Sequence, residues 1–237
     1  KADSAPQQRT DMTDAPPLAV DIDGTLTDGQ GSIDHRTLPV LREWPAPVVV
    51  ATGKSLPYPI ALCQFAGIEG RVIAENGGVV AVAETDTLRF EGDREAAAAV
   101  VDAYVDAGYS LGWSEVAFVN RWRETEIAAA REQPLAPLES IAAEHGLEVV
   151  DTGYAYHVKS PDVNKGRGLE VVADELDIDP ASFLAVGDSE NDVSTFAIAG
   201  ESVAVANADD AALAAADWVT DSSYADGFLE AIGADSR

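Results

Sequence analysis

The chain has 237 residues, and 42 acidic against 15 basic side chains give it a formal net charge of −27. The sequence has no stripe of basic residues that could bind the phosphates of a nucleic acid, which argues against a nucleic-acid partner. The 46% hydrophobic content argues against a disordered acidic chain. The sequence lacks an apolar run long enough to cross a membrane and a charged-then-apolar secretion signal, so we expect no membrane partner and a cytoplasmic location.

The choice of basic residue indicates a salty environment. Only Lys1, Lys54, Lys159 and Lys165 are lysines, and the other eleven basic residues are arginines. A surface this acidic repels itself in dilute salt, whereas at about 1 M salt the screening length falls to about 3 Å. We therefore interpret the chain as a protein built for a salty cytoplasm. The single cysteine, Cys63, excludes an internal disulfide and is expected to be a buried apolar residue.

Residues 1–17 are polar and proline-rich, and we expect them to form a flexible leader. Short apolar runs then recur between helical stretches, a pattern typical of strands covered on both faces. This pattern predicts an α/β fold with a doubly wound, mostly parallel, Rossmann-like sheet. The predicted strands are 18–22, 47–52, 71–75, 183–188, 202–206 and 217–221, and the predicted helices are 55–66, 165–176, 191–199 and 209–216.

The alternation of predicted strands and helices changes between residues 82 and 158. We interpret 82–158 as an inserted, smaller α/β cap domain, which leaves 18–81 and 159–237 as the catalytic core. The elements predicted in the cap are a helix at 94–107, a strand at 115–122, a helix at 135–145, and strands near 147–151 and 154–158.

Two pairs of acidic residues follow predicted strands. Asp21 and Asp23 end the first strand, and because residues i and i+2 of a strand point the same way, we expect their carboxylates to converge. Asp188 and Asp192 flank a strand-to-helix turn. Ligands in such sheets bind beyond the carboxyl ends of the strands, so the four acids are expected around one crevice. Four carboxylates fit a hard cation, and Mg2+ in particular combines carboxylates with water and a substrate phosphate.

Three other residues are suited to binding a phosphate. Thr52 and Gly53 close the second predicted strand, where a hydroxyl and exposed backbone N–H groups can bind oxyanion oxygens. Lys165 begins a predicted helix, a place where the helix dipole is already positive. A lysine kept at that position, in a chain with so few, is best explained if it reaches an anion.

These residues resemble the four ordered motifs of the haloacid dehalogenase superfamily of phosphatases. The motifs are Asp21-Ile22-Asp23-Gly24-Thr25, then Thr52-Gly53, then Lys165-Gly166, and last Gly187-Asp188-Ser189-Glu190-Asn191-Asp192. The large cap between the second and third motifs, with Glu75-Asn76-Gly77-Gly78, is similar to the subgroup that acts on small phosphate esters. Each motif alone has little specificity, but four in this order over residues 18–233 are a strong signal.

The resemblance implies a role for each motif residue. Asp21 would attack phosphorus and form an aspartyl-phosphate, and Asp23 would protonate the leaving alkoxide and then activate water. Lys165 would balance charge on the nucleophile and the phosphate. The remaining implied roles are phosphate positioning by Thr52, Gly53 and Asn191, and Mg2+ binding by Asp21, the backbone carbonyl of Asp23, Asp188 and Asp192, the last of which holds the ion or orients its ligands.

A narrower resemblance, to archaeal phosphoglycolate phosphatases, rests on 120–124, 152–158 and 221–232. It implies a two-carbon substrate whose carboxylate needs a cation from the cap. Arg121 or Arg123 could supply a guanidinium fork for that carboxylate. The alternative is that these arginines pair with nearby glutamates.

The function predicted from these observations is Mg2+-dependent hydrolysis of phosphoglycolate, with a small phosphate ester as the only partner expected and a homodimer left open. The same chemistry on a sugar phosphate is the nearest alternative, because the core motifs contact only the phosphate. A phosphate-receiving signalling domain also uses an aspartate, Mg2+ and a lysine, but such domains are uncapped. His35, His145 and His157 match no ligand spacing and are expected to be surface or satisfied, partly buried side chains.

The charge count generates a prediction about salt. Raising KCl from about 0.1 M to above 1 M shortens the Debye length from about 10 Å to about 3 Å, so repulsion between surface carboxylates should fade. We expect the melting temperature and the hydrolysis rate both to rise over this range. Thermal scans and initial rates across a KCl series at constant Mg2+ test this, and a melting temperature that stays flat or falls would contradict it.

Overall fold

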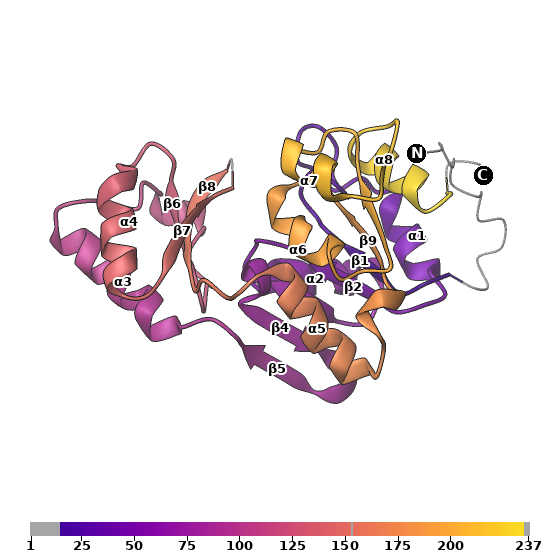
Figure 1. Cartoon of the computed structure of the whole chain (residues 1–237), viewed down its shortest axis with the longest axis horizontal. Coiled ribbons are helices and arrows are strands. Elements are labelled where there is room, and N and C mark those ends of the chain that lie inside the picture. Colours follow the sequence, from indigo (N-terminus) through magenta and orange to yellow (C-terminus); the bar gives the residue numbers. More distant parts are fainter. Residues whose placement is uncertain (1–14, 153, 235–237) are drawn as a thin grey trace.

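The computed structural model describes residues 15–152 and 154–234, which form a larger and a smaller sheet (Figure 1). The larger sheet has eight strands in the order β11-β10-β9-β1-β2-β3-β4-β5. Its strands pair in parallel except for β4 and β5, which are antiparallel. The predicted mostly parallel sheet is therefore confirmed. The strands are β1 Leu18–Val20, β2 Val48–Ala51, β3 Arg71–Ala74, β4 Val79–Val82, β5 Thr87–Phe90, β9 Leu184–Gly187, β10 Glu201–Ala204 and β11 Trp218–Val219.

Helices cover both faces of this sheet, which explains why its strands are apolar throughout. Val20 and Val50 pack toward one face, and their neighbours Ala19 and Val49 pack toward the other, as strand alternation requires. The first face carries α1 Thr37–Glu43, α2 Pro57–Ala66 and α8 Tyr224–Ala231, and the second carries α5 Lys165–Leu176, α6 Val193–Phe196 and α7 Asp210–Ala215. Cys63 is a buried free thiol in α2, as predicted.

The smaller sheet is antiparallel and has the order β6-β8-β7. Alternate side chains of β8, such as Val158, pack with the two cap helices. The opposite face carries His157 and Ala128 and is turned toward the larger sheet (Figure 1). The elements are α3 Arg94–Asp106, β6 Ile127–Ala130, α4 Leu135–Glu144, β7 Glu148–Asp151 and β8 Ala155–Lys159.

One predicted cap strand is wrong. The stretch 115–122 forms a short 3-10 turn and a loop, and the third strand is Ile127–Ala130 instead. The Asn120 side chain accepts from the N–H of Ala128 and donates to its carbonyl, both at 2.8 Å, so the loop lies against β6 through a side chain. An isoleucine followed by three alanines has weak strand propensity, which hid β6 from sequence analysis. The helix predicted at 191–199 is also shorter, because a 3-10 turn precedes α6.

Strand β5 belongs to the larger sheet, which favours a later start of the cap than residue 82. It pairs with β4 in the larger sheet although it lies beyond residue 82, the predicted border. We therefore propose a division after Phe90, with the cap ending at Lys159, the last residue of β8.

The start of the chain was predicted to be a flexible leader, and residues 1–14 of it lie outside the described residues. Pro16 and Pro17 are described, and their carbonyls accept from the indole of Trp44 at 2.9 Å and from the N–H of Leu184 at 2.8 Å. None of the helices in the described ranges is both long and apolar enough to span a membrane.

A buried carboxylate joins the cap to the core. Glu75, directly after β3, accepts from the N–H of Glu124 and from the N–H and hydroxyl of Thr125, each at 2.8 Å. Glu75 and Asn76 both have positive φ, of 50° and 54°, a strained conformation outside glycine that turns both side chains toward the cap. A Cβ on Gly78 would overlap the Thr125 hydroxyl, so a glycine is needed there. The loop after β3 therefore fixes the position of cap residues 124–125.

This contact generates a prediction about stability. Glu75→Ala leaves the N–H groups of residues 124 and 125 without an acceptor, at a cost of about 1–3 kcal/mol each, so the free energy of unfolding should fall by about 2–6 kcal/mol. Glu75→Gln should cost less, because its amide oxygen still accepts. Denaturant unfolding in molar KCl measures both, with the exposed Glu91→Ala as a control. Equal small losses for Glu75→Ala and Glu91→Ala would contradict the role of Glu75.

Candidate active site

The polar residues singled out in the sequence gather at one edge of the larger sheet. Asp21 follows β1, Thr52 follows β2 and Asp188 follows β9, and these three strands are adjacent and parallel. The carboxyl ends of adjacent parallel strands meet at the same edge, so residues far apart in the sequence become neighbours there. A hydrogen bond of 3.0 Å from the Asp21 N–H to the Val186 carbonyl continues the β1–β9 pairing into the site.

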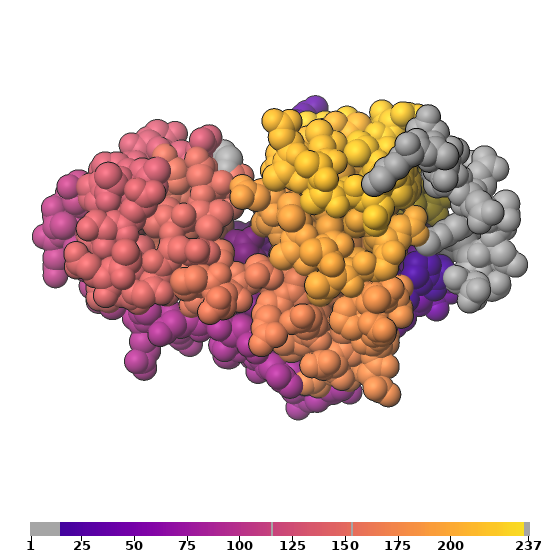
Figure 2. Space-filling model, viewed as in Figure 1, coloured from indigo at the N-terminus to yellow at the C-terminus, as the bar shows by residue number. Residues whose placement is uncertain are grey.

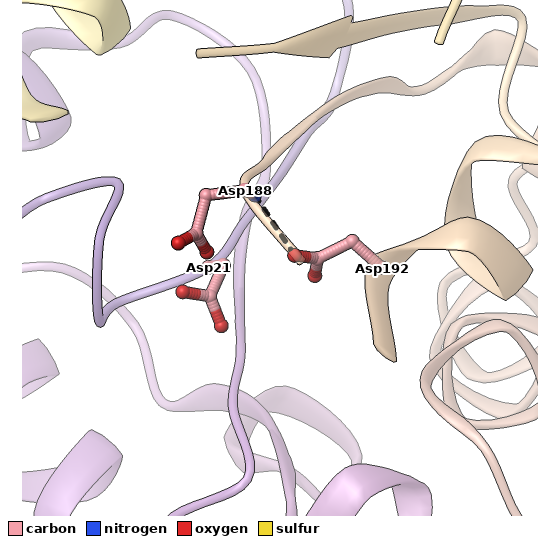
Figure 3. A group of neighbouring side chains, drawn as sticks. All are labelled: Asp21, Asp188 and Asp192. Atoms are coloured by element: carbon pink, nitrogen blue, oxygen red, sulfur yellow. Dashed lines mark hydrogen bonds between the residues drawn. The ribbon is translucent and has the colours of Figure 1, made fainter. Parts of the chain in front are cut away.

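Three carboxylates form a compact group at this edge. Oxygen atoms of Asp21, Asp188 and Asp192 lie within 4.8 Å of one another (Figure 3). Asp21 and Asp192 are buried, and Asp188 is partly buried. Gly24 has a φ of 84°, and a Cβ at this position would overlap the Asp188 carboxylate. The glycine of the first motif therefore makes room for the acid of the fourth.

A buried ammonium group lies against two of these carboxylates. Lys165, the first residue of α5, is fully buried, and its Nζ is 2.6 Å from Asp21 Oδ1 and 2.7 Å from Asp192 Oδ1. Burial alone would lower the lysine pKa, but Asp192 and Asp21 outweigh it, and the pKa is raised. The lysine is therefore charged, and it fixes the orientation of both carboxylates.

The second oxygen of Asp192 is used by the backbone. Asp192 Oδ2 accepts from the N–H of Asp188 at 3.0 Å and from the N–H of Ser189 at 3.2 Å. Its position holds the turn that carries Asp188 after β9. Asp192 therefore connects Lys165 to the loop that presents Asp188.

Two buried carboxylate oxygens in the group lack a hydrogen-bond partner among the described residues, Asp21 Oδ2 and Asp188 Oδ1. Burial, together with the neighbouring carboxylates, raises the pKa of Asp21 to about 7 and that of Asp188 to about 9. A hard cation would satisfy both oxygens and lower both pKa values, and an all-oxygen donor set suits such an ion. The residues present therefore fit a metal ion.

Asp23 takes a different position from the one expected. Its carboxylate is not in the group of three, and it forms an ion pair with Lys54 at 2.7 Å on the half-exposed side of the site. Strand β1 ends at Val20, so strand alternation does not extend through residues 21–23. Asp21 and Asp23 nevertheless line the same pocket.

The residues expected to bind phosphate surround that pocket in part. Gly53, Lys54 and Asn191 line it, whereas Thr52 is buried behind it and accepts from the Lys54 N–H at 3.1 Å. Asn191 Nδ2 donates to Asn76 Oδ1 at 3.1 Å.

The pocket is one lobe of a groove between the cap and the core (Figure 2). The smaller lobe, of about 390 Å³, contains Asp21 and Asp23. The larger lobe, of about 780 Å³, extends toward Lys159 and Lys165. The two lobes share Asn76, Thr152, His157, Asp188, Ser189 and Asn191.

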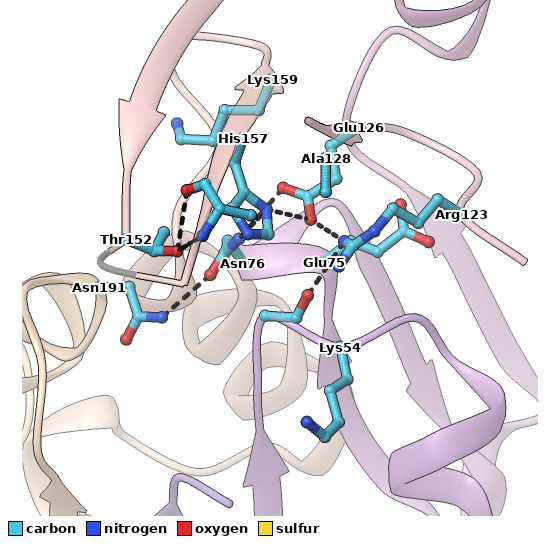
Figure 4. Close-up of polar contacts among 12 residues, drawn as sticks. Lys54, Glu75, Asn76, Arg123, Glu126, Ala128, Thr152, His157, Lys159 and Asn191 are labelled. Carbon is cyan, nitrogen blue, oxygen red and sulfur yellow. Dashed lines mark hydrogen bonds and ion pairs between the residues drawn. The ribbon is translucent and has the colours of Figure 1, made fainter. Parts of the chain in front are cut away.

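The cap contributes a buried charge network to the groove (Figure 4). Glu126 Oε1 is 2.9 Å from His157 Nδ1 and also pairs with Arg123 Nη1, and Glu126 Oε2 accepts from Asn76 Nδ2 at 3.1 Å. Arg123 Nη1 donates in addition to the Gly53 carbonyl at 3.0 Å. Burial acts to raise the pKa of Glu126, but His157 and Arg123 outweigh it and lower the pKa. An ionised glutamate therefore organises the cap side of the site.

Sequence analysis missed part of this network. The sequence predicts a surface or satisfied, partly buried side chain for His157, and it assigns Glu126 no role beyond being one of the glutamates near the two arginines. The structure buries both side chains beside Asn76. The stretch 152–158 was singled out by resemblance, but no local spacing shows that 76, 126 and 157 meet. Arg121 is exposed and lines neither lobe, in contrast to Arg123.

Comparison with known proteins shows the family of this chain. A model of the haloacid dehalogenase-like hydrolases matches residues 18–116 and 136–232, so the chain belongs to that family. This confirms the family predicted from the four motifs.

Similar proteins are found among archaea. A phosphoglycolate phosphatase of Haloarcula marismortui is 62% identical over 93% of this chain and 97% of its own length. Another, from Natronomonas pharaonis, is 59% identical over 91% and 96%. The crystal structure of Thermoplasma acidophilum 0175 has a TM-score of 0.79 at 24% identity, covering 91% of this chain and 96% of that one, which supports the fold.

Proposed function

We propose that this chain is a Mg2+-dependent phosphatase that hydrolyses 2-phosphoglycolate to glycolate and phosphate. The observation that carries the proposal is Asp21, a buried carboxylate that lines a pocket, with one oxygen bound to Lys165 and the other without a partner among the described residues. The choice of substrate is supported by relatives named phosphoglycolate phosphatase that match nearly the whole chain.

In this proposal the reaction proceeds through the chain's own carboxylates. Asp21 attacks the phosphorus, which forms an aspartyl-phosphate and breaks the bond to the glycolate oxygen. Asp23 protonates that oxygen and then takes a proton from the water that hydrolyses the intermediate. The half-exposed position of Asp23, on the same pocket as Asp21, suits a group that meets the leaving oxygen and water in turn.

The metal and phosphate ligands are proposed from the same geometry. Asp21, Asp188 and the backbone carbonyl of Asp23 would hold Mg2+, which when bound offsets charge between the nucleophile and the phosphate. Asp192 orients this group through Lys165 and the loop after β9. Lys165 neutralises part of the charge, and Thr52, Gly53 and Asn191 position the phosphate oxygens.

The substrate carboxylate is proposed to bind Arg123. Two of the guanidinium nitrogens are engaged, Nε with the Val119 carbonyl and Nη1 with Glu126 and Gly53. Among the described residues Nη2 has no hydrogen-bond partner, and Arg123 lines the lobe that contains Asp21. Arg121 is exposed and outside both lobes, so it is not proposed for this role.

A second candidate is hydrolysis of a sugar phosphate. The larger lobe, of about 780 Å³, leaves room for a substrate bigger than phosphoglycolate. A receiver-type signalling function is not supported, because a three-stranded cap with two helices faces the site. Cytoplasmic location and a homodimer stay predictions.

A panel of phosphate esters tests the proposed function. With Mg2+ in molar KCl, 2-phosphoglycolate should have a higher kcat/KM than sugar phosphates. Chelator should abolish hydrolysis, and Ca2+ should fail to replace Mg2+, because Ca2+ takes more ligands at longer distances and would misplace Asp21. Undiminished turnover in excess chelator would contradict the metal requirement, and a preferred sugar phosphate would favour the second candidate.

A substitution at the nucleophile tests the covalent step. Asp21→Asn keeps the shape of the side chain but removes the attacking oxygen, so turnover should fall at least about a thousandfold while the fold persists. Circular dichroism provides the control for folding. A purified variant that retains more than a few per cent of the wild-type rate would be incompatible with an aspartyl-phosphate on Asp21.

A further inference from the structure

His157 is a second cap residue in the lobe that contains Asp21. It lies in β8 on the sheet face opposite the cap helices, and only 5% of its side chain is exposed. It lines both lobes of the groove. A histidine packed this tightly beside the nucleophile's pocket calls for an explanation beyond packing.

The hydrogen bond at His157 Nδ1 determines whether Nε2 can donate or accept. Glu126 is buried and ionised, and its Oε1 is 2.9 Å from His157 Nδ1, so Nδ1 carries the hydrogen and donates it. Nε2 has no hydrogen-bond partner in the described part of the chain, and it is not among the buried unpaired atoms. Glu126 therefore orients the ring (Figure 4), and because His157 lines both lobes, Nε2 is available to a ligand in the groove.

We propose that His157 is a specificity-determining residue that binds the carboxylate of phosphoglycolate through Nε2–H, as an imidazolium. This rests on the proposed function and adds a residue to it. Arg123 and His157 share Glu126 as a partner, so one buried anion orients two donors toward the same lobe. The substrate carboxylate supplies the second negative charge for the two cations.

The protonation state of His157 decides whether it attracts or repels the substrate. With Nδ1–H fixed on Glu126, the neutral ring presents a lone pair at Nε2, whereas the imidazolium presents a donor. The charged groups around the ring are Glu126 at Nδ1, Arg123 on the same glutamate, and Lys159 and Asp188, which line the larger lobe together with His157. The substrate carboxylate needs the imidazolium, because that form has a donor at Nε2.

Asn76 places these cap donors relative to the phosphate side. Its Nδ2 donates to Glu126 and its Oδ1 accepts from Asn191, so one side chain connects the cap network with the fourth motif. A lobe of about 390 Å³ then binds a short substrate at both ends. A substrate with an uncharged group in place of the carboxylate would leave the imidazolium and Arg123 without an anion to bind.

The test compares 2-phosphoglycolate with ethyl phosphate, which has a methyl group in place of the carboxylate. In His157→Asn the amide can still donate to Glu126, but no donor remains at the position of Nε2. KM for phosphoglycolate should rise about ten- to a hundredfold, with little change for ethyl phosphate. His145→Asn, the same substitution at an exposed residue after α4, is the control and should change neither KM.

The pH dependence provides a second readout. In the wild type the preference for phosphoglycolate, expressed as the ratio of the two KM values, should decline as rising pH removes the proton that the imidazolium donates. Taking the ratio cancels the titration of the phosphate group, which both esters share. His157→Gln places an uncharged donor near the position of Nε2, so it should keep part of the preference and lose its pH dependence.

The outcomes separate this inference from the proposed function. A wild type that hydrolyses other esters but not phosphoglycolate overturns both. A wild type that prefers phosphoglycolate, with a preference unchanged in His157→Asn, overturns only the role of His157, as do equal losses on both esters. Should His157→Asn fail to fold, the Gln variant decides, and a wild-type pH dependence in it overturns the role.

Discussion

The site depends on one buried ion triad, Lys165 between Asp21 and Asp192. A fully buried ammonium is costly unless its charge is paired, and here two carboxylates at 2.6 and 2.7 Å pair it. The same contacts fix Asp21 after β1 and, through Asp192, the loop that carries Asp188. With one cation beside three carboxylates, ionisation of all three leaves a negative excess that a metal ion would offset. The triad thus fixes the position of Asp21, the proposed nucleophile, and the excess of carboxylates suits a cation.

The second constraint is the strained loop after β3, which connects the cap to this triad. Glu75 binds cap backbone at residues 124–125, and Asn76 binds Glu126 on one side and Asn191 on the other. Two consecutive positive φ angles are required for neighbouring side chains to make these contacts. The strain is offset by buried hydrogen bonds on both sides. The cap network and the acidic residues of the core are therefore held in fixed positions relative to each other.

Most of the core could be predicted from sequence, because its strands are short apolar runs that end in polar residues. The cap was harder, since β6 is mostly alanine and the preceding loop contains the β-branched and aromatic residues that suggested a strand. In the site, the four motifs predicted that Asp21, Lys165 and Asp188 lie close together, and the structure places all three at one edge of the larger sheet. The Asp23 carboxylate lies apart from this group because β1 ends before residue 23. The contacts that join Asn76, Glu126 and His157 connect residues 31 to 81 positions apart, and no local pattern encodes them.

The scarcity of lysine gains a physical explanation from the groove. The three lysines that the structure describes, Lys54, Lys159 and Lys165, all line its lobes, and each binds a carboxylate. Exposed ion pairs such as that of Arg167 with Glu170 use arginine. A lysine ammonium is a compact point charge that fits between two carboxylates, whereas a planar guanidinium needs a wider opening. Lys165 therefore occupies a place that requires a small cation, whereas Lys54 and Lys159 each bind one carboxylate and Arg123 serves in the same groove.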